Sequence, residues 1–185
     1  MMFYKGEMLQ IFISVVTISL AFSLAALTSF PLILFTVGIG FILHELAHKA
    51  VAQHFGAVAY YKAWMEGLAL AIVIALATGG RFTFAAPGAV YIHKKNLTRR
   101  EDALISGAGP FVNIVIALFF LMLVKSPSLG TLAMFGFHVN AFLALFNLIP
   151  VPPLDGSHVF RANFLVWAVL FLPALYLTFF IPVGF

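Results

Sequence analysis

Long apolar segments recur from one end of this chain to the other, and no other feature constrains its fold as strongly. They lie at about residues 10–30, 32–55, 101–124, 132–149 and 163–183. A helix needs about 20 apolar residues to cross a bilayer, and these segments meet or approach that length. Hydrophobic residues make up 63% of the 185 and charged residues only 9%, against roughly a quarter charged in soluble domains. The sequence therefore predicts an all-α polytopic membrane protein with five or six transmembrane helices.

We expect a single integral-membrane domain over residues 1–185, with its core at about 32–160. A cleaved signal peptide is the alternative for the first apolar segment, because Lys5 precedes it. That segment is longer than the apolar part of a usual signal peptide and lacks a convincing small-residue cleavage site, so a retained helix is favoured. Cysteine is absent, which excludes thiolate ligands. The net charge of +4 is small, and the basic residues are scattered, so no nucleic-acid partner is expected. The expected surrounding is the lipid bilayer.

Residues 57–100 do not follow the pattern of a long helix. The apolar run at 67–78 is too short to span as a helix, and Gly79-Gly80 predicts a turn. Residues 81–84 alternate polar and apolar side chains as a strand does, and 89–92 resume an extended pattern. We predict a re-entrant, partly β segment between the second and third long helices, with a short true crossing as the alternative.

The distribution of basic residues predicts the orientation in the membrane. Seven of the ten lie after residue 48 and before Glu101: Lys49, Lys62, Arg81, Lys94, Lys95, Arg99 and Arg100. Cytoplasmic loops carry an excess of Lys and Arg, so this side is predicted to face the cytoplasm. Lys5 agrees with a cytoplasmic N-terminus. The expected location is the cell membrane, which the chain crosses several times.

The second apolar segment contains His44-Glu45-Leu46-Ala47-His48, with three ionisable side chains in five residues. Such groups are costly at membrane depth and indicate a functional site. Two histidines four residues apart share one helix face and can bind a single zinc ion, and Glu45 can serve as general base. The same short pattern also arises by chance in helices. A chance occurrence would not explain why three polar side chains lie within a membrane segment. The expected site lies roughly 10 Å from the cytoplasmic end of its helix, at 1.5 Å per residue.

A catalytic zinc site needs a third protein ligand. Asp155 is the only carboxylate after Asp102, and the preceding run Pro150-Val151-Pro152-Pro153 can carry it into the helix bundle. A lone carboxylate in an apolar region is costly without a cation, so Asp155 is the predicted third ligand. A helix N-cap is the alternative role for Asp155, and His158, one turn further on, is the alternative ligand.

Polar and small residues also lie on the later apolar helices. Asn113, Asn140 and Asn147 are most simply explained by interhelical hydrogen bonds, and Gly107 and Gly109 by close helix contact.

Three motifs occur in the order seen in the site-2 protease family of intramembrane zinc metalloproteases. They are HELAH at 44–48, GAGPFVN at 107–113 and NLIPVPPLDG at 147–156. The chain resembles that family over about residues 32–156. Compact archaeal-type members without a PDZ or CBS domain are the closest in size.

The resemblance implies that His44, His48 and Asp155 bind one zinc ion and that Glu45 is the catalytic base. The implied activity is hydrolysis of peptide bonds within or near the transmembrane segment of a membrane-protein substrate, as in regulated intramembrane proteolysis. The active site would lie nearer the cytoplasmic face.

The resemblance also concerns substrate binding. It implies that Asn147 positions substrate or steadies the developing oxyanion, and it matches Asn113 to the middle motif, so both are predicted substrate-binding residues. A substrate helix must unwind before its carbonyls can react. An exposed strand edge near residues 81–92 would hold the unwound segment by backbone pairing.

Other functions stay open at this point. A metal transporter would also place His and Asp in a bundle, but the candidate ligands cluster towards one side and Glu45 would have no task. A catalytically inactive relative that binds membrane proteins would need no general base. A different membrane protease with this motif would use Glu66 or Glu101 as third ligand, and neither follows a proline-rich break as Asp155 does.

Overall fold

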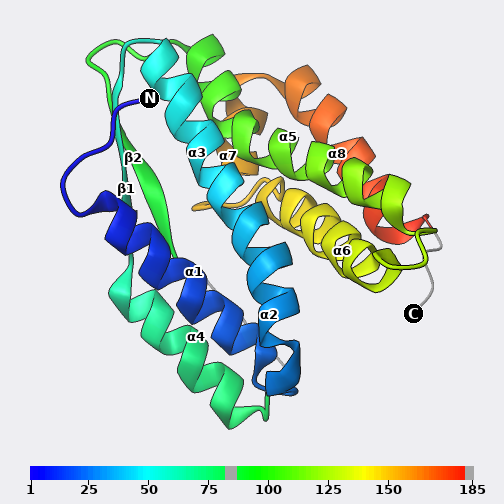
Figure 1. The fold of residues 1–185 in the computed structure, drawn as a ribbon. Helices are drawn as coiled ribbons and strands as arrows, with labels where there is room; N and C mark the ends of the chain where they lie inside the picture. The colour runs from blue at the N-terminus through cyan, green and yellow to red at the C-terminus, as the bar shows by residue number, and fades with distance from the viewer. Residues whose placement is uncertain (82–86, 182–185) are drawn as a thin grey trace.

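The fold, a computed structural model, describes residues 1–81 and 87–181. Among these residues, three helices are long and apolar enough to cross a membrane: Leu27–His54, Arg99–Leu123 and Gly130–Asn147. The second is α5 and the third α6, and both are regular α-helices. They form the centre of the molecule, where α5 packs against the first helix on one side and against α6 on the other (Figure 1).

The first long helix is continuous but not uniform. It consists of the 3-10 turn η1 (Leu27–Ser29), α2 (Phe30–Ile33), the π-helical η2 (Leu34–Gly38) and α3 (Ile39–His54). Pro31 lies in the first turn of α2, where its missing N–H has no intrahelical partner to lose. The predicted span at 32–55 corresponds to this helix.

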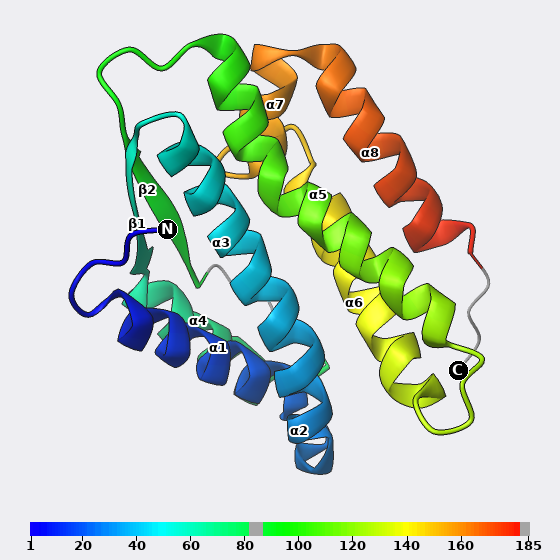
Figure 2. The ribbon, with the colours of Figure 1, turned by 45° about the horizontal axis from the view of Figure 1, so that its top comes forward.

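Shorter elements flank the central helices on two sides. On one side lie α1 (Glu7–Ser23), α4 (Met65–Ala77) and the strands β1 (Val58–Ala63) and β2 (Gly88–His93). On the other lie α7 (Asp155–Ala162) and α8 (Phe164–Phe179). Figure 2 shows α1 and α4 side by side, with the end of α1 beside the lower part of the first long helix.

The predicted count of five or six spans is not confirmed. Helices α1, α4 and α8 have 17, 13 and 16 residues, fewer than the roughly 20 that a crossing helix needs. The first predicted span extends to residue 30, but α1 ends at Ser23. Leu24, Ala25 and Ala26 continue the apolar run, so hydropathy does not mark the end of the helix. Just beyond the end of α1, Gly80 of the turn after α4 approaches the backbone of Ala25 so closely that a Cβ would lie 2.2 Å from its nitrogen.

The segment between α3 and α5 is partly β, as predicted. Gly79 and Gly80 form the expected turn after α4, with φ of 61° and 75°, and β2 covers the predicted extended residues 89–92. The strand predicted at 81–84 falls largely outside the described residues. The partner strand β1 was not predicted; it pairs with β2 in an antiparallel register that sets Tyr61 opposite Val90. Membrane re-entry of this segment stays a prediction.

Thr98 and Glu101 form the capping box that starts α5, a pattern visible in the sequence.

Small residues bring α5 and α6 close together. Further along, Ala117 of α5 and Ala141 of α6 are fully buried in the shared core. Gly136 lies so near the ring of Phe120 that a Cβ would be 2.4 Å from it. Such small residues allow close backbone approach between membrane helices.

Candidate metal centre

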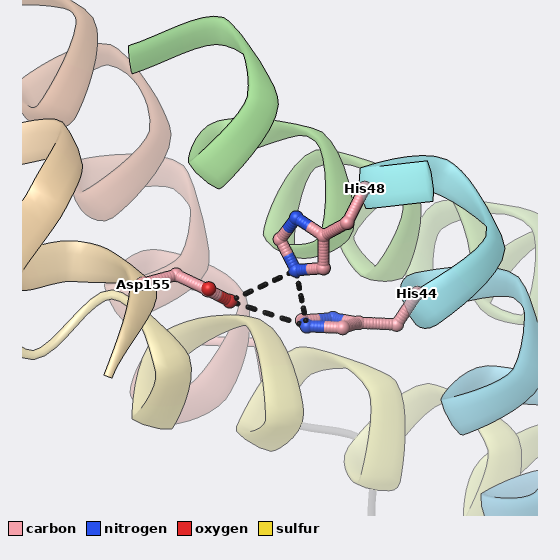
Figure 3. Close-up of side chains that lie close together, drawn as sticks. All are labelled: His44, His48 and Asp155. Carbon is pink, nitrogen blue, oxygen red and sulfur yellow. Dashed lines mark hydrogen bonds and ion pairs between the residues drawn. The ribbon is translucent and has the colours of Figure 1, made fainter. Parts of the chain in front are cut away.

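Three side chains from two distant parts of the chain meet beside α5. His44 and His48 project from one face of α3, and Asp155, the first residue of α7, points at both (Figure 3). Their ligand atoms are close together: 3.0 Å separates the two Nε2 atoms, and Asp155 Oδ2 lies 3.2 Å from each. Among the described residues this is the one group of three or more His, Cys, Asp or Glu side chains that could hold a metal ion.

The other ring nitrogen of each histidine fixes its protonation. His48 Nδ1 lies 2.7 Å from the carbonyl oxygen of Ile105, which can only accept, so Nδ1 must carry the hydrogen. His44 Nδ1 lies 2.6 Å from Oδ1 of Asn113. The amide of Asn113 cannot be reversed, because its Nδ2 donates to the carbonyl of Gly40 at 3.2 Å. In the neutral form, each imidazole therefore directs an Nε2 lone pair into the site.

This set of donors fits a zinc ion. Two lone pairs and a carboxylate oxygen face one another, and one proton could satisfy only some of these three contacts. Zinc binds His nitrogen and carboxylate oxygen at about 2.0–2.2 Å, which places tetrahedral ligands roughly 3.3 Å apart. The three observed separations of 3.0 to 3.2 Å are close to that value. The residues present therefore suit a catalytic zinc site with three protein ligands.

Helix α5 approaches the two imidazoles with a glycine. A Cβ on Gly109 would lie 2.4 Å from Nε2 of His48 and 2.5 Å from Nε2 of His44, well inside any real contact. The sequence predicts close helix contact at both glycines of the motif. The two glycines differ in the structure, because a Cβ on Gly107 would meet the ends of two apolar side chains, Leu170 at 3.0 Å and Val159 at 3.9 Å. The role of Gly109 beside the imidazoles was missed, and only the GxG spacing could have indicated it.

The positions of Asp155 and His158 do not support the alternative roles that the sequence allows them. Leu154, and not Asp155, is the N-cap residue of α7, and no side chain caps this helix. His158 lies apart from the two imidazoles, and its Nδ1 is 3.6 Å from Oδ1 of Asp102 with half of its side chain exposed. Burial would raise the pKa of the Asp155 carboxyl, but the adjacent His48 and His44, in their protonated form, lower it by charge and hydrogen bonding, and the result is a pKa below its ordinary value. The carboxyl thus stays ionised, as a metal ligand must be.

Glu45 lies beside the site but is not part of the ligand set. Its side chain is buried, and its Oε2 has no hydrogen-bond partner among the described residues. The backbone N–H of Val90 in β2 faces its carboxylate. A buried carboxylate oxygen without a partner is costly, which is acceptable where a reaction uses it. This position is compatible with the predicted role as base, which stays a prediction.

In the structure Asn113 contacts protein groups, including His44, whereas the sequence predicts that it contacts substrate. It is fully buried, and its Nδ2 donates to Oδ1 of Asn140 at 2.9 Å as well as to Gly40. Asn140 in turn donates to the carbonyl of Gly136 at 2.8 Å, so the orientation of both amides is determined. Asn113 thus orients His44, and contact with substrate stays a prediction. The interhelical hydrogen bonds predicted for Asn113 and Asn140 are present.

Asn147 ends α6 just before the segment that leads to Asp155. Its Nδ2 donates to the carbonyl of Leu143 in the same helix, at 2.9 Å. The side chain would therefore have to leave this bond to contact a substrate, and its predicted role is untested by the geometry.

The segment that carries Asp155 is held from behind by α8. Trp167 donates its indole N–H to the carbonyl of Leu148 at 2.8 Å, and its ring stacks on Phe171. A Cβ on Gly156 would lie 2.2 Å from that same carbonyl group, so the segment folds tightly back on itself. These contacts explain how a residue after a proline-rich break reaches a defined position.

Comparisons with known proteins agree with this chemistry. A model of Peptidase family M50 matches residues 124–174, which include Asp155. A protein of Methanocaldococcus jannaschii named "Putative zinc metalloprotease MJ0611" is 44% identical over 177 residues, covering 92% of each chain. A Bacillus subtilis protein named "Putative zinc metalloprotease YwhC" is 31% identical over 153 residues, covering 72% of this chain and 69% of its own.

A third relative of the same description, Rip2 of Mycolicibacterium smegmatis, is 33% identical over 134 residues, covering 62% of this chain and 50% of its own. No solved structure matches the chain.

Proposed function

Because the chain belongs to peptidase family M50, the site-2 protease family, we propose that it is a zinc metalloprotease that cleaves peptide bonds within or near transmembrane segments of membrane proteins. The observation that carries this proposal is the triangle of His44, His48 and Asp155, whose lone pairs and charge call for one divalent cation. The three long apolar helices of the same bundle support a location in a membrane. Regulated intramembrane proteolysis is the biological setting that such an activity fits.

The residues of the site divide the chemistry among them. His44, His48 and Asp155 would hold zinc, which when bound supplies a Lewis acid that makes a water molecule more acidic and polarises a peptide carbonyl. Glu45 takes the proton of the attacking water and passes it to the leaving amine. Its buried Oε2, which has no hydrogen-bond partner in the part of the chain that the structure describes, leaves it free to receive that proton. Asn113 and the carbonyl of Ile105 keep both imidazoles in the tautomer that can bind metal.

Two further residues or elements would act on the substrate. Asn147 would turn its amide from Leu143 to the developing oxyanion, a contribution commonly worth about 3 kcal/mol. Strand β2 would hold the unwound substrate by backbone pairing along the edge that faces away from β1. The support is that Val90 directs its N–H towards Glu45 and not towards β1. A membrane-protein segment in extended form would thus lie beside the base.

The proposal is tested by incubating the purified protein in detergent with a transmembrane peptide. The wild type is compared with Glu45→Gln and with chelator-treated protein, and the products are identified by mass spectrometry. We expect cleavage by the wild type alone, with metal retained in Glu45→Gln. Cleavage that persists in Glu45→Gln would refute the assigned base, and metal uptake into vesicles without any cleavage would favour transport instead.

A further inference from the structure

A buried ion pair that the proposed chemistry does not use lies one residue beyond the second imidazole. Lys49 of α3 and Glu7 of α1 contact each other, and they are 0% and 2% exposed. The two carboxylate oxygens of Glu7 also accept backbone hydrogen bonds, from Tyr61 of β1 at 2.9 Å and from Tyr4 at 3.0 Å. Glu7 therefore links α1, the helix of the metal ligands and the sheet, three elements that lie side by side in both views (Figures 1 and 2).

The helix face that carries the base also carries this ion pair. Phe41, Glu45 and Lys49 follow one another at intervals of four residues, so they form one stripe along α3. The ring of Phe41 contacts the ring of Tyr61, with 5.9 Å between centroids. At the other end of the stripe, Lys49 contacts Glu7, which binds the backbone of Tyr61. Tyr61 is thus held by both ends of the stripe whose middle residue is Glu45.

The sheet carries this restraint across to the base. Tyr61 is the register partner of Val90. Since the N–H of Tyr61 points to Glu7 and away from β2, the alternation of antiparallel pairs directs the N–H of Val90 away from β1. That N–H faces the carboxylate of Glu45. A shift of Tyr61 relative to Glu7 would therefore shift the outer edge of β2 relative to the base.

Side chains already occupy the other edge of the sheet. Gln10 of α1 accepts from the backbone N–H of Ala63 at 2.9 Å, and Gln53 of α3 donates to the carbonyl of Ala59 at 3.3 Å. On the outer edge of β2 the N–H of Val90 faces Glu45, so an extended peptide that pairs along this edge would lie beside the base. A buried ion pair is weak evidence for stability, because apolar residues of the same size often stabilise as well, and setting a register is the better attested use of such a pair.

We propose that Glu7 and Lys49 are positioning residues that set the register of the β2 edge against Glu45, and thereby choose which peptide bond of the substrate is cleaved. This inference rests on the proposed proteolytic function. It predicts an effect on the position of cleavage and not on metal binding.

The test compares the products of the wild type with those of the double variant Glu7→Gln/Lys49→Met, which leaves no buried charge unpaired. Lys49→Arg keeps the cation and serves as the conservative variant. Lys94→Met is the matched control, because it breaks the ion pair of Lys94 with Glu101 at the start of α5. Products of one transmembrane peptide are identified by mass spectrometry, and zinc content is measured for each variant.

We expect the double variant to keep its zinc and to cleave at additional bonds about two residues from the wild-type bond. Side chains alternate between the two faces of a strand, so a shift of the substrate by two residues along β2 presents the same face again. Lys49→Arg and Lys94→Met should keep the wild-type bond. A merely structural role would lower all products in proportion without moving the cleaved bond, and that result would overturn the proposal. If the double variant loses zinc, Gln10→Leu, which frees Ala63 without burying a charge, should show the same spread of cleaved bonds.

A distance measurement separates this inference from the proposed function. The chain has no cysteine, so Ala50→Cys on α3 and Ala89→Cys on β2, both exposed, can be spin-labelled specifically. We expect one narrow distance distribution in the otherwise native chain and a broader or shifted one with Glu7→Gln/Lys49→Met. An unchanged distribution would overturn the positioning role whatever the activity. Absence of cleavage by the wild type would instead count against the proposed function.

Discussion

Gly109 lies against both imidazoles of the metal centre, at a distance that leaves no room for a side chain. Its neighbour in the motif, Gly107, faces the flexible end of Leu170 instead. The two glycines therefore differ in what they do, although they look alike in the sequence. One shapes the site and the other allows helix packing.

Substitution of Gly109 by alanine is expected to abolish zinc binding. The added methyl group would occupy space beside both Nε2 atoms, so the zinc affinity should fall by at least about 100-fold, the upper end for residues around metal ligands. Metal content after purification measures the effect, with Gly107→Ala as the matched control that keeps its zinc. Full zinc occupancy in Gly109→Ala would show that the centre can move aside.

Asn113 offers a second test at this scale. If its task is to orient His44, replacing it with leucine should lower zinc affinity by about 10- to 100-fold, because the imidazole loses the acceptor of its Nδ1 hydrogen. Asn113→Asp, which keeps an acceptor, should lose less. Competition with a zinc-binding dye measures both. An unchanged zinc affinity together with a raised KM in Asn113→Leu would favour the predicted contact with substrate.

At the scale of the elements, the position of Asp155 depends on a helix outside the three motifs. Helix α8 holds the segment before Asp155 through Trp167, and α7 begins at Asp155 itself. The segment has no regular structure, so its contacts with α8 take the place of backbone pairing. The apolar helix predicted at 163–183 thus supports the site from behind, as well as extending the bundle.

Trp167→Phe should weaken this support while keeping the aromatic stack. The buried carbonyl of Leu148 would lose its partner, which costs about 1–3 kcal/mol of stability. We expect a lower thermal midpoint in detergent and weaker zinc binding through the displaced Asp155. Trp64→Phe is the control, because the chain has two tryptophans and Trp64 is half exposed. Equal behaviour of the two variants would argue against a supporting role for α8.

At the scale of the whole molecule, the metal centre lies between the second half of the first long helix (Leu27–His54), the first half of α5 and the start of α7. These parts come from one end of the three long helices, as the sequence predicts from its basic residues and from the depth of the motif. The predicted orientation places this end at the cytoplasm. The structure contains no membrane, so orientation stays a prediction that labelling can test.

Single cysteines at the two ends of α5 are expected to react from opposite sides of the membrane. Asn96→Cys precedes α5 and Ser128→Cys follows it, and both positions are exposed. In intact cells an impermeant maleimide should label Ser128→Cys, and Asn96→Cys only after the membrane is opened. Because neither change removes a basic residue, the charge bias is preserved. The reverse pattern would invert the orientation, and labelling of both in intact cells would mean that α5 does not cross.

Much of the metal site could be predicted from the sequence because its strongest signals are local. Helix periodicity alone sets His44 and His48 on one face, and the cost of charge in an apolar segment points to a function. Asp155 could be chosen because it is the last carboxylate of the chain. The matched family and its close relatives confirm the predicted family and metalloprotease class, while the individual roles of Glu45, Asn113 and Asn147 stay predictions.

Other features depend on contacts between residues far apart in the chain. Strand β1 was not predicted, because its partner lies beyond α4, and hydropathy could not show that α1 ends at Ser23. The closeness of Gly109 to the imidazoles, the orientation of His44 by Asn113 and the link from Glu7 to Lys49 are likewise tertiary. The sequence by itself determined the apolar helices and which residues are able to bind zinc, since both follow from local chemistry. Only the tertiary structure decided the distances between those residues, because the distances depend on how helices far apart in the sequence pack against one another.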